Sequence, residues 1–173
     1  MKISYIRIQN FKSIRDLEIT ELENALILVG KNNTGKTNVI DAILAATGYH
    51  TVCTEEFLDP QKSIDITLSI EFTEEDLQSY QTRGMVSRHR DYEKWLEEFR
   101  SLIPSFQDNT VTFTFHINPE HKVRYNDGFQ KNNPYIREIF PKIYHIDQTR
   151  NLDTLQNDVF SFYDKESFEL LKD

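Results

Sequence analysis

The stretch LILVGKNNTGKTNVIDAI, from Leu26 to Ile43, decides the fold of this 173-residue chain. Its middle holds Gly30 and Gly35, two of only five glycines in the sequence. The apolar run just before them predicts a strand over residues 25–29 that is buried on both faces. The apolar residues after them recur at helical spacing, and Gly48 stands where a helix commonly ends. The sequence therefore predicts a strand, a glycine loop and a helix in this order.

The glycine loop has the Walker A pattern, because Gly35 is followed directly by Lys36 and Thr37. Glycines let the backbone curl so that successive N–H groups form an anion-binding nest, and the start of a helix adds its positive dipole end. Lys36 can reach the β- and γ-phosphates of a nucleotide, and the Thr37 hydroxyl can bind Mg²⁺. The strand before the loop and the helix after it supply the structural context that the motif requires. The pattern predicts a nucleotide site.

Alternating apolar and polar residues predict strands elsewhere in the chain. One strand covers residues 2–8 and pairs with residues 13–20 across a turn at Asn10–Ser13. The clearest alternation places Ile64, Ile66, Leu68, Ile70 and Phe72 on one face. Further strands are predicted at 110–117, at 122–128 as its partner, and at 142–147.

The segment from Thr73 to about Ile103 reads as a charged helical insertion that Gly84 interrupts. Within it, one stripe of apolar residues is predicted to face the core, namely Tyr92, Trp95, Leu96, Phe99 and Leu102. The basic and aromatic residues at 87–94 suit a phosphate backbone, but Glu93, Glu97 and Glu98 interleave with them and favour a solvated helix face. No repeat or linker divides the chain, so residues 1–173 are interpreted as one α/β domain with a mixed sheet, an antiparallel β-layer and this insertion.

The first 46 residues resemble the N-terminal start of the SMC, RecF and OLD group of ABC-type P-loop ATPases. Members of this group open with a strand, an Asn-Phe-basic-Ser turn and a second strand, followed by a Gly-x-Asn-x-Ser/Thr-Gly-Lys-Ser/Thr-Asn loop. Asn10–Ser13 matches the turn, and Asn32, Thr34 and Asn38 match the loop beyond the bare Walker A pattern. Asn33 replaces a glycine that is common in SMC-like loops, so the loop is closer to the OLD branch, which includes nuclease-fused and anti-phage defence ATPases.

The resemblance implies ATP and Mg²⁺ as cofactors and assigns the site residues. The nucleotide-binding residues are expected to be Gly30, Asn32, Asn33, Thr34, Gly35, Lys36, Thr37 and Asn38. Lys12, in the turn beside the nucleotide, is expected to approach the phosphates, although a solvated lysine in a strand-connecting turn explains it equally well. Gln148, after the predicted strand at 142–147, matches the Q-loop glutamine that helps to hold Mg²⁺ and the attacking water, although a glutamine on a surface loop explains it equally well. Arg150 is a weaker candidate for phosphate or DNA contacts.

Two parts of the family pattern are missing from the sequence. There is no serine-glycine signature, and no apolar run is followed by Asp-Glu as in Walker B. We therefore expect this chain to be the N-terminal lobe of a longer protein, whose own C-terminal lobe supplies both. The resemblance further implies a homodimer of ATP-sandwiched heads that acts on DNA, with a TOPRIM or other nuclease as a possible attached or partner activity.

Two other functions stay open. Asp147 is the best imitation of a Walker B carboxylate, which would make the chain a self-sufficient P-loop switch or phosphotransferase. A nucleotide-sensing module without hydrolysis is the other alternative.

Composition and short motifs exclude several other classes of protein. The formal net charge of −8 excludes the whole-domain basic footprint of a compact nucleic-acid binder, but not a local basic patch. The single cysteine, Cys53, fits a reducing cytoplasm, and no apolar run or signal peptide indicates a membrane protein. His89–Asp91 resembles a kinase catalytic loop without its asparagine, and His116 and His121 lack partners at zinc spacing.

Overall fold

The computed structural model describes residues 1–20, 22, 26–29, 35–140 and 143. The chain divides into two units, Met1–Pro141 and Lys142–Asp173, and the second unit contains only Ile143 among the described residues. All elements below therefore belong to the first unit. No helix among the described residues is long and apolar enough to cross a membrane.

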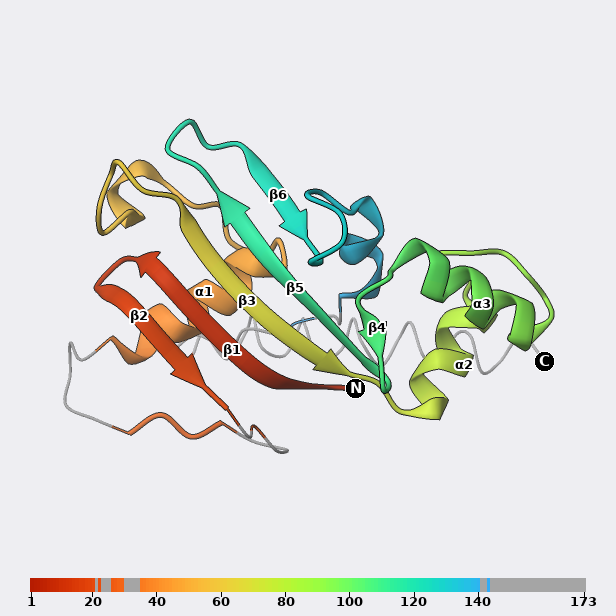
Figure 1. Cartoon of the computed structure of the whole chain (residues 1–173). Helices are drawn as coiled ribbons and strands as arrows, with labels where there is room; N and C mark the ends of the chain where they lie inside the picture. The colour runs from red at the N-terminus through yellow and green to blue at the C-terminus, as the bar shows by residue number, and fades with distance from the viewer. Residues whose placement is uncertain (21, 23–25, 30–34, 141–142, 144–173) are drawn as a thin grey trace, which may run out of the picture. The chain divides into compact units, whose positions relative to one another are not determined.

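A six-stranded sheet forms the centre of this unit (Figure 1). Its strands are β1 (Lys2–Phe11), β2 (Ile14–Ile19), β3 (Ile64–Glu71), β4 (Phe106–Gln107), β5 (Thr110–Ile117) and β6 (Val123–Asn126). The order is β2-β1-β3-β5, and β5 then pairs with β4 near its start and with β6 near its end. All these pairs are antiparallel. The strands predicted at 2–8, 13–20, 64–72, 110–117 and 122–128 are thus confirmed.

The sheet has one apolar and one polar face, as the alternation predicts. Register places Leu68 of β3 between Ile6 and Phe113, and each of these side chains is at most 1% exposed. On the other face, hydroxyl groups pair across the strands, with Thr67 Oγ1 2.8 Å from Thr114 Oγ1. Cross-strand pairs of this kind pin the register of the sheet.

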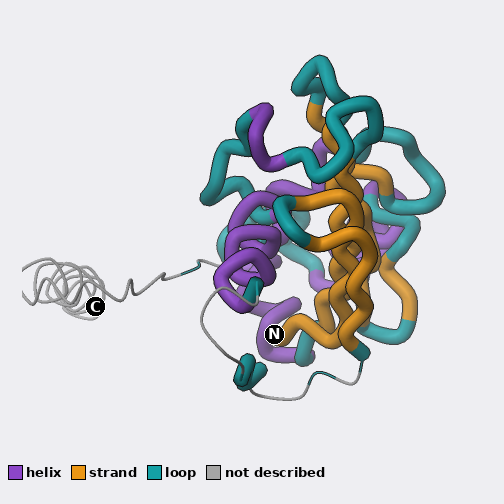
Figure 2. Tube along the Cα trace, turned by 90° about the vertical axis from the view of Figure 1, so that its left-hand side faces the viewer, coloured by secondary structure: helices purple, strands orange, loops and turns teal. Residues whose placement is uncertain are grey.

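One helix lies against two neighbouring strands of the sheet. Helix α1 (Lys36–Ala46) packs against β1 and β3 (Figure 1). In the view of Figure 2, most of the helical tube lies to the left of the strands. The unit also contains two short 3₁₀ segments, η1 (Thr54–Glu56) and η2 (Pro134–Ile139).

The helical insertion is present as α2 (Glu74–Thr82) and α3 (Tyr92–Leu102), which lie together at the β4 end of the sheet (Figure 1). Its predicted apolar stripe does face the core, because Trp95 and Phe99 are fully buried. The Phe99 ring packs edge-on against Phe106 of β4, with ring centroids 5.0 Å apart.

One predicted strand is absent from the described residues. Residues 26–29, which the sequence assigns to a strand buried on both faces, have no strand structure. Ile27 and Val29 are 80% and 89% exposed. A buried strand needs a neighbour on each side, and none of the described strands pairs with this segment. The described sheet is therefore antiparallel throughout. The mixed sheet that the sequence predicts would also contain parallel strands, and the described residues form none.

Candidate nucleotide-binding site

Helix α1 begins directly after Gly35, within the predicted nucleotide loop. Gly35, the N-cap residue, has a φ of 86°, in the left-handed region that favours glycine, and it offers no side chain to cap the helix. The Thr37 side chain lies in the first turn and is exposed. At the other end, Gly48 follows the helix with a φ of 84°, which confirms its predicted role as the terminating glycine. A helix N-terminus that follows a left-handed glycine is a geometry that suits a bound phosphate group.

The β1–β2 turn touches this helix start. The Asn38 side-chain amide donates a hydrogen bond to Ser13 Oγ over 2.8 Å. A Cβ atom added to Gly35 would lie 3.3 Å from the same Ser13 oxygen, so the turn also leaves little room for a side chain at this position. Ser13 of the turn therefore lies against Gly35 and Asn38 at the start of α1.

Asn10 holds the turn in place. Its side-chain amide contacts the carbonyl oxygens of Asp59, Lys62 and Ser63 at 2.9–3.2 Å, and its Oδ1 accepts the N–H of Asp59 at 2.7 Å. Asn10 itself has a φ of 60°, which asparagine tolerates better than most residues. The backbone adds a hydrogen bond from Leu58 N to Asn10 O. The turn is thereby clamped to the loop that precedes β3.

Lys12 reaches into a cluster of ionisable side chains. Its Nζ lies 2.5 Å from Asp41 Oδ2 of α1 and 3.1 Å from Glu56 Oε1 of η1. His50 Nε2 lies 2.9 Å from both Glu56 oxygens, and Cys53 N donates to Glu56 Oε2 over 2.9 Å. One ammonium group thus connects the β1–β2 turn with α1 and η1.

Comparison with protein-family models identifies the kind of domain that carries this site. The model for the AAA ATPase domain matches residues 1–173, the whole chain. The chain belongs to this ATPase family. The predictions of an α/β P-loop ATPase fold and of an ATPase domain are therefore confirmed, and ATP is the nucleotide that the family implies.

Solved structures with similar folds come from SMC proteins, at low sequence identity. An SMC ATPase studied for ATP-driven dimerization and DNA-stimulated activation is 16% identical, with a TM-score of 0.46 and coverage of 72% of this chain and 68% of that chain. An Smc head bound to the C-winged helix domain of ScpA is 15% identical, with a TM-score of 0.45 and coverage of 72% and 35%. An Smc head domain with a coiled coil and joint from Pyrococcus yayanosii is 16% identical, with a TM-score of 0.45 and coverage of 75% and 23%. A comparison with curated proteins finds no match.

The contacts within this cluster favour the charged forms of Lys12 and Glu56. Burial lowers the pKa of Lys12, but the hydrogen bonds to Asp41 and Glu56 outweigh it, so this pKa lies above the usual lysine value. Burial likewise raises the pKa of Glu56, but the Cys53 N–H, His50 and Lys12 more than compensate, so the pKa lies below the usual value. The ATPase domain therefore keeps a charged ammonium group and a charged carboxylate beside the start of α1.

The Cys53 side chain is exposed, but its environment disfavours the nucleophilic thiolate form. The negative charge of Glu56 raises the pKa of the Cys53 thiol above 9.0, and the thiol also lies 3.6 Å from the Glu56 carboxylate. A thiol that stays protonated is a poor nucleophile.

Of the predicted site residues, the structure describes Lys12 and the residues that end the loop, Gly35, Lys36, Thr37 and Asn38. The remaining ones lie outside the described residues, namely Gly30, Asn32, Asn33, Thr34 and Gln148, together with Asp147, Arg150 and the strand predicted at 142–147.

The sequence interpretation missed three members of the cluster: Asp41, His50 and Glu56. Asp41 carried a usable signal, because it follows Thr37 by four residues and must lie on the same helix face. His50 and Glu56 carried none, since only the tertiary fold brings η1 to the β1–β2 turn.

The histidines that lack zinc partners have ordinary structural contacts. His116 Nδ1 lies 2.7 Å from Asp65 Oδ1 on the neighbouring strand, and His121 Nε2 lies 3.0 Å from Thr54 Oγ1. His89 of the kinase-like tripeptide pairs with Glu98, and Asp91 caps α3. Within the described part of the chain, no group of three or more His, Cys, Asp or Glu residues is arranged to hold a metal ion.

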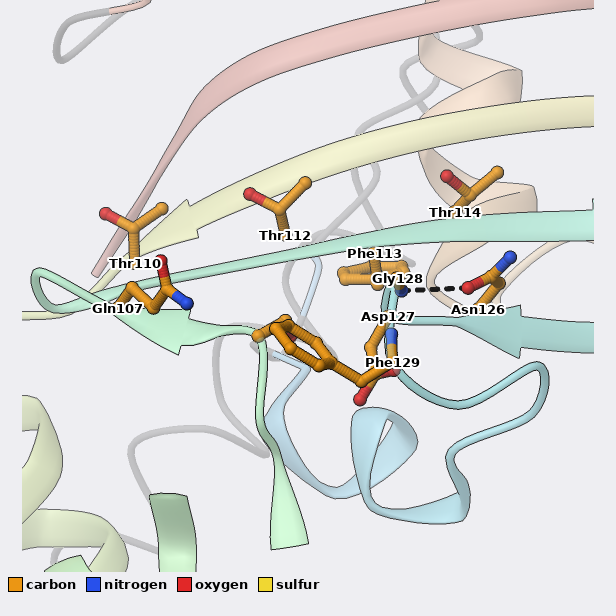
Figure 3. A pocket seen from close by; sticks show the side chains of 10 residues that line it. Gln107, Thr110, Thr112, Phe113, Thr114, Asn126, Asp127, Gly128 and Phe129 are labelled. Atoms are coloured by element: carbon orange, nitrogen blue, oxygen red, sulfur yellow. Dashed lines mark hydrogen bonds between the residues drawn. The ribbon is translucent and has the colours of Figure 1, made fainter. Parts of the chain in front are cut away.

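A separate hollow of about 470 Å³ is lined by β4, β5, β6 and the loop after β6 (Figure 3). None of the described Walker A residues, Gly35, Lys36 and Thr37, lines it. The Asp127 carboxylate, the charged group among its lining residues, accepts hydrogen bonds from Phe129 N, Gln130 N and Asn133 Nδ2. This carboxylate is negative and already bonded, so it does not suit a nucleotide phosphate, and the contacts at the start of α1 are the better guide to the site.

Proposed function

We propose that this ATPase domain is the ATP-binding half of an ABC-type ATPase head of the SMC, RecF and OLD kind, closest to the OLD branch. The observation that carries the proposal is the contact between the β1–β2 turn and the start of α1, through Ser13, Gly35 and Asn38. The turn and the loop are the two motifs on which the sequence resemblance rests. Their direct contact supports a shared role in binding one ligand.

Mg²⁺–ATP fits the described part of the site. The left-handed Gly35 and the helix N-terminus that follows it suit a phosphate group, and the exposed Thr37 hydroxyl suits a metal ion in contact with water. In the proposal, the backbone of Gly30–Thr37 and the Lys36 side chain bind the phosphates. Thr37 holds Mg²⁺, which neutralises phosphate charge, and Lys12 contributes a second positive charge from the turn.

The role of Gln148 belongs to hydrolysis rather than to binding. We propose that it helps to hold Mg²⁺ and to orient the attacking water. Phosphoryl transfer needs an in-line water and positive charge around the γ-phosphate in addition to a phosphate loop. The proposal assigns the base after Walker B to the protein's own C-terminal lobe and the opposing γ-phosphate contact to a partner head.

For the complete protein, we propose that ATP binding and hydrolysis by paired heads gate an activity on DNA, in DNA maintenance or in defence against phage. An attached or associated nuclease fits this role. The resemblance of the first 46 residues to the OLD branch supports this finer assignment, and the net charge of −8 means that any DNA contact has to be local.

The experiment that tests the proposal is an ATP turnover assay on the purified chain, with Lys36→Ala as the control for contaminating ATPases. We expect negligible hydrolysis, because half of a sandwich leaves one side of the nucleotide in water and supplies no base. Robust hydrolysis that Lys36→Ala abolishes would overturn the half-site proposal. It would favour the self-sufficient P-loop enzyme that uses Asp147 as its Walker B carboxylate. ATP binding without hydrolysis even in the complete protein would favour the nucleotide-sensing module.

A further inference from the structure

We infer that Asp41 and Glu56 are positioning residues, which hold the Lys12 ammonium group beside the start of α1 with one N–H donor left for a nucleotide phosphate. The inference rests on the proposed function, because Lys12 has a phosphate to meet only if the loop binds a nucleotide. The family resemblance concerns Lys12 alone and says nothing of either carboxylate.

The ion pairs of Lys12 within the described part of the chain use two of its three N–H donors, and its Nζ also lies 5.5 Å from the centroid of the Phe11 ring. One points to Asp41 Oδ2 at 2.5 Å and one to Glu56 Oε1 at 3.1 Å. A lysine ammonium group has three donors and no acceptor. The backbone of the same residue is also tied to η1, because Lys12 N donates to Glu56 O over 2.6 Å. Both ends of the side chain are therefore fixed, and a third donor remains for a ligand.

The position of Asp41 directs the ammonium group toward the nucleotide end of the helix. Asp41 follows Thr37 by four residues, so the two side chains lie on the same face of α1, one turn apart. Helical side chains lean toward the N-terminus, so the Asp41 carboxylate lies over the turn that contains Thr37 and Asn38. Asn38 in turn contacts Ser13, the neighbour of Lys12, which brings the turn and the helix start together at this point.

The carboxylates are themselves well held. The Glu56 side chain is only 10% exposed and accepts hydrogen bonds from Cys53 N and His50 Nε2 in addition to Lys12. A long lysine side chain normally loses rotamer freedom when it binds a ligand. Here that freedom is already lost before any nucleotide arrives, which is the condition for preorganised binding.

The structure also defines the opposite possibility, in which the two carboxylates withhold Lys12 from the nucleotide. The two mechanisms predict changes of opposite sign. If the carboxylates position Lys12, their neutralisation removes the contribution of Lys12 to ATP affinity. If they withhold Lys12, their neutralisation raises the affinity, and the gain requires Lys12.

A double-mutant cycle on the full chain separates these outcomes. Equilibrium binding of Mg²⁺–ATP is measured for the wild type, Lys12→Met, Asp41→Asn/Glu56→Gln and the triple variant. We expect Lys12→Met to lower the affinity of the wild type at least about 10-fold, equivalent to about 1.4 kcal/mol. In the Asp41→Asn/Glu56→Gln background, the same change should lower the affinity less than about 3-fold. A merely structural role of the carboxylates would weaken binding equally with and without Lys12.

Two controls keep the test specific. Asp16→Asn removes the carboxylate of the exposed Arg7–Asp16 pair on the same β1–β2 hairpin, and it should leave the effect of Lys12→Met unchanged. If the Glu56→Gln change at the buried site unfolds the domain, the cycle is run with Asp41→Asn alone, which still removes the negative charge from the shorter of the two contacts.

Three results would overturn the inference. The first is an equal effect of Lys12→Met in both backgrounds. The second is a Lys12-dependent gain in affinity on neutralising the carboxylates, and the third is no effect of Lys12→Met on a wild type whose binding depends on Lys36. ATP binding that does not depend on Lys36 would instead refute the proposed nucleotide site itself. Failure of the inference can therefore be distinguished from failure of the proposed function.

Discussion

Replacement of Asn10 by alanine should destabilise the domain strongly, although the substitution removes only a small side chain. Asn10 is 8% exposed, and its amide contacts three carbonyl oxygens while its Oδ1 accepts one backbone N–H. Since the amide has two hydrogens, about three effective hydrogen bonds are lost. At a net 0.5–1.5 kcal/mol each, the loss is about 1.5–4.5 kcal/mol. Alanine at a φ of 60° adds about 1 kcal/mol of backbone strain.

The expected cost is therefore about 2.5–5.5 kcal/mol, or a fall in melting temperature of roughly 5–20 °C for a chain of this size. Urea unfolding followed by fluorescence is a suitable assay, because the chain has a single tryptophan and Trp95 is fully buried. Asn126→Ala is the matched control, since Asn126 is exposed and its Oδ1 accepts one hydrogen bond, from Gly128 N. We expect the control to cost less than about 1 kcal/mol. If Asn10→Ala costs no more than the control, the clamp on the turn does not exist as described.

Two further predictions concern Glu56. Burial raises the pKa of Glu56, but the Cys53 N–H, His50 and Lys12 outweigh it and lower this pKa, so the stabilising contribution of Glu56 is complete above the ordinary value of 4.5 and is lost as the pH falls through the lowered pKa. The free energies of unfolding of the wild type and Glu56→Gln, measured in urea, should therefore differ at pH 7 and converge in acid. A constant difference down to pH 2 would contradict this. The charge of Glu56 also raises the pKa of the Cys53 thiol, so Glu56→Gln should speed alkylation of Cys53 by iodoacetamide at pH 8, and an unchanged rate would show that the carboxylate does not control the thiol.

Much of the fold is predictable because alternation of apolar and polar residues along a strand indicates a sheet with one buried face. The residues Ile64 to Phe72 show this most clearly, since every second side chain is apolar and is buried in the structure. The start of α1 after Gly35 and its end before Gly48 are predictable for a related reason, because both glycines have the left-handed φ that the sequence signals imply.

The errors and omissions have a different physical origin. An apolar run such as residues 26–29 shows that a segment is suited to burial, but it does not show which strand will pair with it. Glu56 and His50 enter the site through contacts between segments that are distant in sequence from Lys12. Neither residue stands in a periodic pattern or a motif, so only the tertiary structure reveals the cluster.

Nucleotide binding by the loop from Gly30 to Thr37, through Lys36, is the property on which the proposed function depends. Calorimetric titration of the chain with Mg²⁺–ATP, compared with Lys36→Ala, tests it most directly. A charge-assisted contact to phosphate contributes about 1.5–3 kcal/mol, so the variant should bind about 10- to 150-fold more weakly while it retains the wild-type unfolding transition. Equal affinity of a folded Lys36→Ala variant and the wild type would contradict the assignment of the nucleotide site.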